Sequence, residues 1–247
     1  HILILPGIHK MLYISNIGWT SEQDDAAYDL MHRYGFTGLE IAPTRIFPQK
    51  PYGDLKRAED WAKKLFMDEG FAVASLQSIW YGMNERIFGS EDERQRLLEY
   101  TKSAIEFAEA VGAKNLVFGC PRNRQIPDGA DEEIAIAFFH EIGEYAFSHN
   151  TCVGMEANPP IYNTNYINTT EQALALINKI DSKGFKLNLD LGTMIYNQED
   201  VSLLDDHIEM INHIHISEPG LAPIEKRGIH SQIKQMIYER YFGYVSI

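Results

Sequence analysis

Short apolar runs alternate with longer amphipathic segments along most of this chain. The apolar runs lie at residues 11–18, 37–42, 71–77, 114–118, 152–156, 185–190, 213–217 and 243–247. Short runs that are apolar throughout are typical of strands buried on both faces of a sheet. The pattern therefore predicts a parallel sheet whose strands are joined by helices.

The segments between the runs place apolar residues at helical spacing. They predict helices at residues 22–34, 55–69, 91–111, 132–149, 170–179 and 231–240, and a short helical stretch at 203–209. Ser21 is a suitable N-cap for the first helix, and Gly35 and Gly70 are suitable stops for the first two.

Eight strands joined by helices close most simply as a (β/α)₈ TIM barrel. We predict an α/β fold of this kind in a single domain, residues 11–247, with strand eight at the C-terminal end. Helix eight, which would follow strand eight in a complete barrel, is missing. An open doubly wound sheet is the alternative, but Gly18-Trp19-Thr20 after the first strand is not a phosphate-binding turn. Residues 1–10 are interpreted as an N-terminal extension.

Composition narrows the classes of function. The 247 residues carry a formal net charge of −13, which repels a phosphate backbone, so nucleic acid is not expected as a partner. No apolar run approaches the roughly 20 residues that span a bilayer, so no membrane partner is expected either. Cys120 and Cys152 are the only cysteines, and with no secretory signal they predict reduced thiols and a cytoplasmic location.

Three predicted strands end on side chains that bind metal ions. Glu156 ends the apolar run in VGMEANP, Asp190 stands among apolar residues in KLNLDLG, and His215 lies in INHIHISEP. A TIM barrel carries its chemistry at the C-terminal ends of the strands, so we expect these side chains to meet there. Burying a lone carboxylate is costly, and a nearby cation offsets that cost. Two carboxylates and one imidazole favour Mn²⁺ or Mg²⁺, with Zn²⁺ and Co²⁺ as alternatives.

Two further residues of the INHIHISEP motif are candidates. His213 lies two positions before His215 and faces the same side of the strand, so one of the two histidines is the ligand and the other is structural or contacts substrate. His215 is preferred as the ligand because it lies nearer the end of the strand. Glu218, just beyond the strand, either lies beside the site or is a solvated loop acid.

Other side chains are candidates for contacts with a substrate. Glu40, inside the second predicted strand, either orients substrate or pairs with a lysine or arginine of the barrel. Gln77 and Trp80 follow the third strand, where an aromatic ring either walls a sugar pocket or only caps the barrel. The set also includes Trp19, Asn158 and His230.

The motifs MEANP, LNLDLGTM, HIHISEP and GYVSI occur in an order and spacing that resemble the xylose-isomerase-like TIM barrels. The resemblance is strongest to the sugar phosphate isomerase/epimerase family, which includes the ketose 3-epimerases. It implies one divalent metal held by Glu, Asp, His and Glu from strands five to eight, with Glu156, Asp190 and His215 as the first three ligands. The fourth, a Glu, follows directly after the motif that reads GYVSI here. Ile247 is the last residue of this sequence, so the fourth ligand lies beyond it or the site lacks it.

Two positions depart from the epimerase pattern. Epimerase relatives often carry His three residues after the metal Asp and Arg six residues after the metal His, whereas this chain has Thr193 and Leu221. The endonucleases of the same superfamily hold three zinc ions and need further histidines at strand ends, where this chain has Gln77, Cys120 and Thr193. We therefore expect a single metal rather than a cluster of three.

The resemblance implies a divalent-metal-dependent isomerase or epimerase of a small sugar, sugar phosphate or polyol. Proton transfer next to a carbonyl would pass through a metal-bound enediolate, with Glu156 as both ligand and proton shuttle. Two other hypotheses stay open: a non-catalytic sugar-binding barrel, and a metal-dependent lyase such as a keto-inositol dehydratase. Related barrels are often dimers or tetramers, so a homo-oligomer is also considered.

Overall fold

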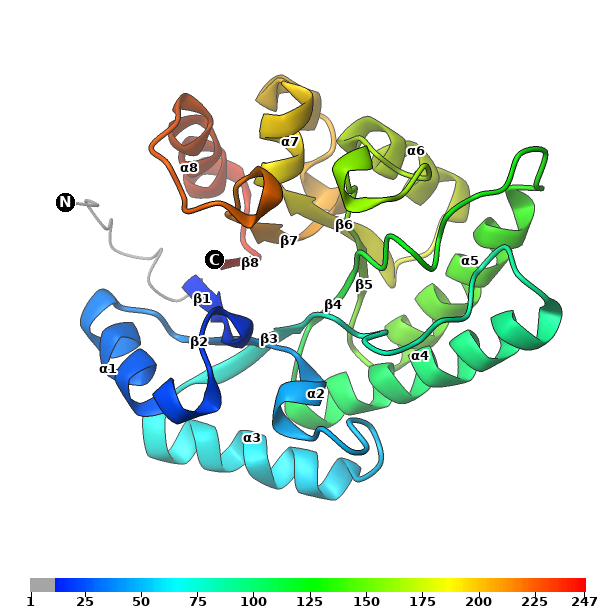
Figure 1. Cartoon of the computed structure of the whole chain (residues 1–247). Helices are drawn as coiled ribbons and strands as arrows, with labels where there is room; N and C mark the ends of the chain where they lie inside the picture. Colours follow the sequence, from blue (N-terminus) through cyan, green and yellow to red (C-terminus); the bar gives the residue numbers. More distant parts are fainter. Residues whose placement is uncertain (1–11) are drawn as a thin grey trace.

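The computed structural model describes residues 12–247, which form one closed barrel of eight parallel strands with helices around it (Figure 1). The strands follow chain order from β1 to β8, and β8 closes the barrel by pairing with β1. The predicted single-domain TIM barrel is confirmed. The predicted N-terminal extension, residues 1–10, and Met11 lie outside the described residues.

The strands coincide with the predicted apolar runs, and β6 has the predicted bounds. The strand bounds are β1 Leu12–Ser15, β2 Gly38–Ile41, β3 Ala72–Leu76, β4 Asn115–Phe118, β5 Val153–Met155, β6 Phe185–Asp190, β7 Ile211–His215 and β8 Tyr244–Ser246. The seventh strand ends at His215, two residues before its predicted end. His215 is therefore the last residue of its strand, as Asp190 is of β6.

Helices α3 and α4 also have the predicted bounds. The helix bounds are α1 Asp24–Tyr34, α2 Pro43–Ile46, α3 Leu55–Glu69, α4 Glu91–Val111, α5 Glu133–Ser148, α6 Thr170–Ile180, α7 Leu191–Asn197 and α8 Gly228–Arg240. Gly35 (φ 75°) and Gly70 (φ 73°) end α1 and α3 in the left-handed conformation, which glycine adopts without strain, so both predicted stops are confirmed. Within the described range, no helix is long and apolar enough to cross a membrane.

The predicted N-cap at Ser21 is wrong. Ser21 lies inside a 3₁₀ turn, η3 (Ser21–Gln23), which precedes α1. Thr20 is the N-cap of this turn, and its backbone N–H donates to the side chain of Gln23 at 3.3 Å. The chain therefore completes one tight turn before the α-helix begins.

The helix predicted at residues 203–209 is also misplaced. The helix after β6 is α7, which begins directly after the last residue of the strand. Asp190 itself caps α7, because its carboxylate accepts a hydrogen bond from the backbone N–H of Thr193 at 2.8 Å. Only two 3₁₀ turns, η5 (Val201–Leu204) and η6 (Ile208–Met210), lie in and around the predicted segment.

The centre of the barrel is polar, in contrast to the apolar layer between strands and helices. Asn115 of β4 donates from Nδ2 to Ser75 Oγ of β3 at 2.9 Å and to Asn188 Oδ1 of β6 at 3.2 Å. All three side chains are fully buried. Gly154 of β5 leaves the space they occupy, since a Cβ there would lie 2.6 Å from Asn115 Oδ1. This chain of polar groups leads to the end of β6, where the candidate site begins.

Candidate metal centre

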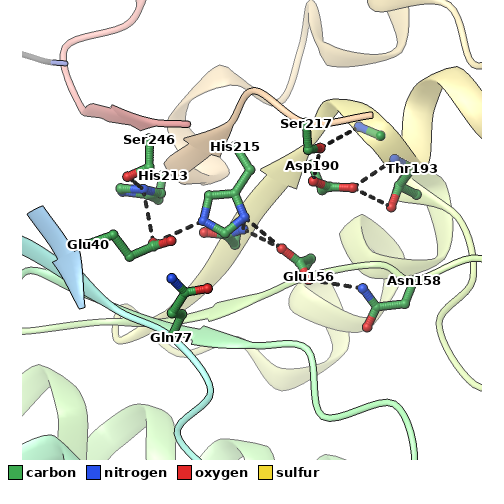
Figure 2. A network of polar contacts seen from close by, with 12 residues as sticks. Glu40, Gln77, Glu156, Asn158, Asp190, Thr193, His213, His215, Ser217 and Ser246 are labelled. Carbon is green, nitrogen blue, oxygen red and sulfur yellow. Dashed lines mark hydrogen bonds and ion pairs between the residues drawn. The ribbon is translucent and has the colours of Figure 1, made fainter. Parts of the chain in front are cut away.

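Glu156 follows β5 directly, and three side chains hold its carboxylate (Figure 2). Its backbone N–H donates to the carbonyl of Phe118 at 3.0 Å, which fixes its backbone beside β4. Oε1 lies 2.9 Å from His215 Nδ1 and accepts from Asn188 Nδ2 at 3.1 Å. Oε2 accepts from Asn158 Nδ2 at 2.9 Å. The carboxylate of Glu156 therefore cannot rotate without losing a hydrogen bond.

Asp190 ends β6 and faces the same space. Oδ2 accepts from the backbone N–H and the hydroxyl of Thr193, at 2.8 and 2.9 Å, and Oδ1 accepts from the hydroxyl of Ser217. Burial, and then the nearby charge of Glu156, raise the pKa of Asp190 to about 6. A group of this kind is stabilised in its charged form by a cation.

His215 ends β7 and lies between two carboxylates. The register of β6 and β7 pairs it directly with Asp190, so the two strand ends present both side chains together. Its Nδ1 lies 2.9 Å from Glu156 Oε1 and its Nε2 lies 2.9 Å from Glu40 Oε2. Burial lowers the pKa of an imidazole, but the charge of Glu40 and the hydrogen bonds to both carboxylates outweigh burial. They raise the pKa of His215 well above its ordinary value.

The three predicted ligands converge. Glu156, Asp190 and His215 each offer one ligand atom, and these atoms all lie within 4.8 Å of one another. Two carboxylate oxygens and one imidazole nitrogen at this separation fit one divalent cation. His215 Nδ1, which faces Glu156, is the nitrogen that an ion could use, while Nε2 would keep its partner Glu40.

Glu40 and His213 form a second buried layer behind His215. Glu40 is 1% exposed; burial opposes its ionisation, but the charge of His215 and the hydrogen bond to it prevail and lower the pKa of Glu40 to about 2. His213 is fully buried, lies 2.7 Å from Ser246 Oγ and 3.5 Å from Glu40 Oε2, and burial lowers its pKa to about 3. The predicted lysine or arginine partner of Glu40 is wrong, because its partners are imidazoles. Glu40, His213 and His215 also form a group with ligand atoms within 4.8 Å.

Asn158 joins this network, whereas Gln77 lies beside it. Asn158 supplies the N–H that bonds Glu156 Oε2. Figure 2 places Gln77 next to the network, and its Nε2 donates to Ser15 Oγ of β1. The described hydrogen bond of the Gln77 side chain is therefore with the first strand and not with a predicted metal ligand.

The two predicted tryptophans have partners of their own. Trp80 is 3% exposed; its indole N–H donates to Thr101 Oγ1 at 2.8 Å, and its ring packs edge-on against Phe118 at 4.7 Å. These are the contacts of a core residue. Trp19 donates from Nε1 to Asp24 at 2.7 Å, and the Arg45 guanidinium lies 5.6 Å from its ring centroid.

Glu218 and His230 meet at Arg227, in the segment after β7. Arg227 Nε donates to both oxygens of Glu218, at 2.8 and 2.9 Å, and this ion pair lowers the pKa of Glu218. Glu218 is 2% exposed, so the alternative of a solvated loop acid is wrong. His230 accepts the backbone N–H of Arg227 on Nδ1 at 3.3 Å, and its buried Nε2 has no partner among the described residues.

Three residues that contact side chains of the site escaped the sequence prediction: Asn188, Ser217 and Arg124, whose guanidinium donates to Asn158 Oδ1 at 3.0 Å. Asn188 lies two positions before Asp190 and therefore on the same side of β6, a signal that alternation along the strand provides. Ser217 lies within the INHIHISEP motif, two positions after His215. Arg124 gives no such signal, because an arginine in a loop usually lies on the surface.

Comparisons with known proteins agree with this architecture. A family model described as xylose isomerase-like TIM barrel matches residues 28–237. The sequence has no significant match among curated proteins.

Many solved structures have a similar fold, and three illustrate the range. The apo form of 3-keto-D-glucoside 4-epimerase from E. coli is 20% identical, with 96% of this chain and 90% of that chain covered and a TM-score of 0.72. D-Psicose 3-epimerase with D-tagatose, from Clostridium cellulolyticum H10, is 14% identical over 96% and 83% of the two chains, with a TM-score of 0.77. The IolI protein with a bound zinc atom is 15% identical over 96% and 87%, with a TM-score of 0.69.

Proposed function

This chain belongs to the xylose isomerase-like TIM barrel family, and from that premise we propose that it is a divalent-metal-dependent isomerase or epimerase of a small sugar or sugar phosphate. The observation that carries the proposal is the convergence of Glu156, Asp190 and His215, whose ligand atoms lie within 4.8 Å of one another. The fold alone would not carry it, since one fold hosts many reactions. The sugar epimerases among the similar structures support the substrate class.

Glu156, Asp190 and His215 would hold the ion, and the oxygen-rich set favours Mn²⁺ or Mg²⁺. A bound divalent ion supplies Lewis-acid stabilisation of the negative charge that develops on a substrate carbonyl oxygen. The side chains of the chain itself do the rest of the chemistry. Asn188 and Asn158 hold the Glu156 carboxylate by one N–H each, at 3.1 and 2.9 Å, so that it keeps one orientation.

Glu156 is the proposed proton shuttle. Its side chain is 14% exposed, whereas that of Glu40, on the other side of the His215 ring, is 2% exposed. Glu156 is therefore the carboxylate of the pair that a substrate can reach. As a base it would accept a proton from the carbon next to the carbonyl. Return of that proton to the former carbonyl carbon gives isomerisation, whereas epimerisation requires a second acid that protonates the same carbon from the opposite face.

Tyr162 is a proposed substrate contact. Its hydroxyl oxygen accepts the backbone N–H of Gly220 at 2.9 Å, so the loops after β5 and β7 meet at this side chain. Burial raises the pKa of Tyr162, and the charges of Asp190 and Glu156 add to that effect, so the phenol stays protonated. Its O–H can donate to a substrate oxygen. Leu221, where epimerase relatives often carry Arg, is 83% exposed and supplies no such group.

Exchange of sugar hydrogens for deuterium from the solvent tests the proposal without a known substrate. The protein is loaded with Mn²⁺, incubated in D₂O with a panel of ketoses, aldoses and their phosphates, and examined by NMR for deuterium next to the carbonyl. We expect exchange with at least one sugar, and its loss in Glu156→Gln. Glu99→Gln, on the exposed face of α4, is the matched control and should exchange as wild type does.

The outcomes separate the three hypotheses. Bound Mn²⁺ without exchange on any sugar in the panel would contradict the isomerase assignment and favour a sugar-binding barrel. Exchange accompanied by loss of water from the substrate, seen in the products, would replace it with a lyase.

A further inference from the structure

Arg124 is a fully buried cation that pairs with no carboxylate of the described residues. It lies in the loop after β4 and is 0% exposed. Its guanidinium makes no ion pair with any described carboxylate, and its Nε has no hydrogen-bond partner among the described residues. A buried charge in this state is costly unless its remaining N–H groups have partners.

The guanidinium bonds to the segment that carries Glu156. One terminal nitrogen donates to the carbonyl of Glu156 at 2.8 Å. The other donates to Asn158 Oδ1 at 3.0 Å and to the carbonyl of Ile167 at 3.1 Å. Arg124 thus joins the start and the end of the loop after β5 and contacts the backbone of the proposed proton shuttle.

The contact with Asn158 has a chemical consequence. A guanidinium has only donors, so Asn158 must turn its carbonyl oxygen toward Arg124. The amide nitrogen of Asn158 then faces the other way, where it donates to Glu156 Oε2 at 2.9 Å. Arg124 and Glu156 therefore favour the same orientation of the amide, one through its oxygen and the other through its nitrogen.

From this geometry we infer that Arg124 is a positioning residue for Glu156. Through Asn158 it keeps an N–H donor on Oε2, which leaves Oε1 facing His215 Nδ1, toward the position of the ion. Without Arg124 the oxygen of the Asn158 amide loses its partner, so only Glu156 holds the amide and the N–H donor to Oε2 is less firmly placed. The effect on metal binding stands on this geometry alone, while any effect on turnover rests on the proposed function.

Lysine cannot replace arginine here. The two contacts with Glu156 and Asn158 come from two different nitrogens of one planar fork, whereas an ammonium is a single point on a flexible stem. Arg124→Lys should therefore behave nearly as badly as Arg124→Met, although it keeps the charge.

The test is a double-mutant cycle with Mn²⁺ alone. Mn²⁺ affinity is measured by calorimetry for wild type, Arg124→Met, Arg124→Lys, Asn158→Ala and the double variant Arg124→Met/Asn158→Ala. Each single change should weaken binding by about 10-fold, as is typical for residues that orient a ligand. The double variant should bind Mn²⁺ about as weakly as the single variant with the lower affinity, because both changes act through the same donor, Asn158 Nδ2. Arg96→Met, at an exposed ion pair on α4, is the control and should bind as wild type does.

The outcomes are distinct. Unchanged Mn²⁺ affinity in the Arg124 variants, or losses that simply add in the double variant, would overturn the inference. Asn158→Ala keeps Arg124, so it carries the test if the Arg124 variants do not fold by circular dichroism. Weakened Mn²⁺ binding together with an absence of sugar exchange in wild type would leave the positioning role standing and remove only the isomerase assignment. A wild type that binds no Mn²⁺ would remove both.

Discussion

The Nε2 atom of His215 lies 2.9 Å from Oε2 of Glu40, on the side of the ring opposite Glu156. A carboxylate in this position holds the proton on Nε2 and leaves Nδ1 available as a metal ligand. The two residues are 175 positions apart in the sequence, and closure of the barrel brings them together.

Glu40→Gln should weaken Mn²⁺ binding by roughly 10- to 100-fold, the usual effect of removing the carboxylate behind a ligating histidine. The neutral amide keeps the shape of the side chain but supplies no charge to make the imidazole a stronger ligand. Calorimetric titration with Mn²⁺ measures the change. Ser246→Ala removes the hydroxyl that contacts the His213 ring but no side-chain contact of His215 among the described residues. This variant should bind Mn²⁺ within about 2-fold of wild type. Equal affinities for Glu40→Gln and wild type would contradict this role.

Asp190→Asn should stabilise the metal-free protein at neutral pH. Because the pKa of Asp190 is raised from 3.8 to about 6 in the folded chain, its contribution to stability is complete below pH 3.8 and is lost as the pH rises through 6. Asparagine has no proton to lose and gains no buried charge, so the advantage of the variant should grow between pH 4 and pH 7.5. We expect it to reach on the order of 2 kcal/mol.

Urea unfolding of chelator-treated wild type and Asp190→Asn at several pH values measures this difference. Asp205→Asn, at an exposed ion pair, is the matched control and should not stabilise the protein at neutral pH. An Asp190→Asn advantage that stays constant from pH 4 to pH 7.5 would show that the pKa of Asp190 is not raised.

Much of the fold is readable in the sequence because its signals are local. Helix α4 begins at a Ser90 cap and stops at Gly112 in the left-handed conformation, and α3 stops in the same way at Gly70. Helix α7 lacks a separate signal of this kind. Its N-cap is Asp190, which is also the last residue of β6. A role as a metal ligand already accounts for this aspartate in the sequence, so nothing there indicates the start of a helix.

The residues of the site also differ in whether local sequence predicts them. Glu156, Asp190 and His215 stand out because each interrupts or ends an apolar strand. Arg124 does not, because its role depends on contacts with residues 32 to 43 positions away that exist only once β4 and β5 are paired. The physical difference is between a side chain placed by its own strand and one placed by the closed barrel.

Metal affinity should rise with pH. The ion competes with protons for Asp190, whose pKa is raised to about 6, and for His215, whose pKa is raised well above its ordinary value. As the pH rises through 6, Asp190 loses its proton and competition for the site weakens. Calorimetry at pH 7 in two buffers of different ionisation enthalpy should therefore show that protons are released when Mn²⁺ binds, and affinity should increase steadily from pH 5.5 to pH 8. Affinity that does not change over this range would mean that neither residue binds the ion.

Trp80→Phe should lower stability and leave metal binding intact. The substitution removes the indole N–H that donates to Thr101 and part of a ring packed against Phe118, which should cost about 1–3 kcal/mol in the free energy of unfolding. Urea unfolding measures that cost, and Mn²⁺ affinity should stay within about 2-fold of wild type. Trp61→Phe, a partly buried tryptophan of α3 packed edge-on against Phe47, is the matched control and should cost less. A Trp80→Phe variant with unchanged stability and a raised KM for the sugar identified by exchange would instead place this ring in the wall of the substrate pocket.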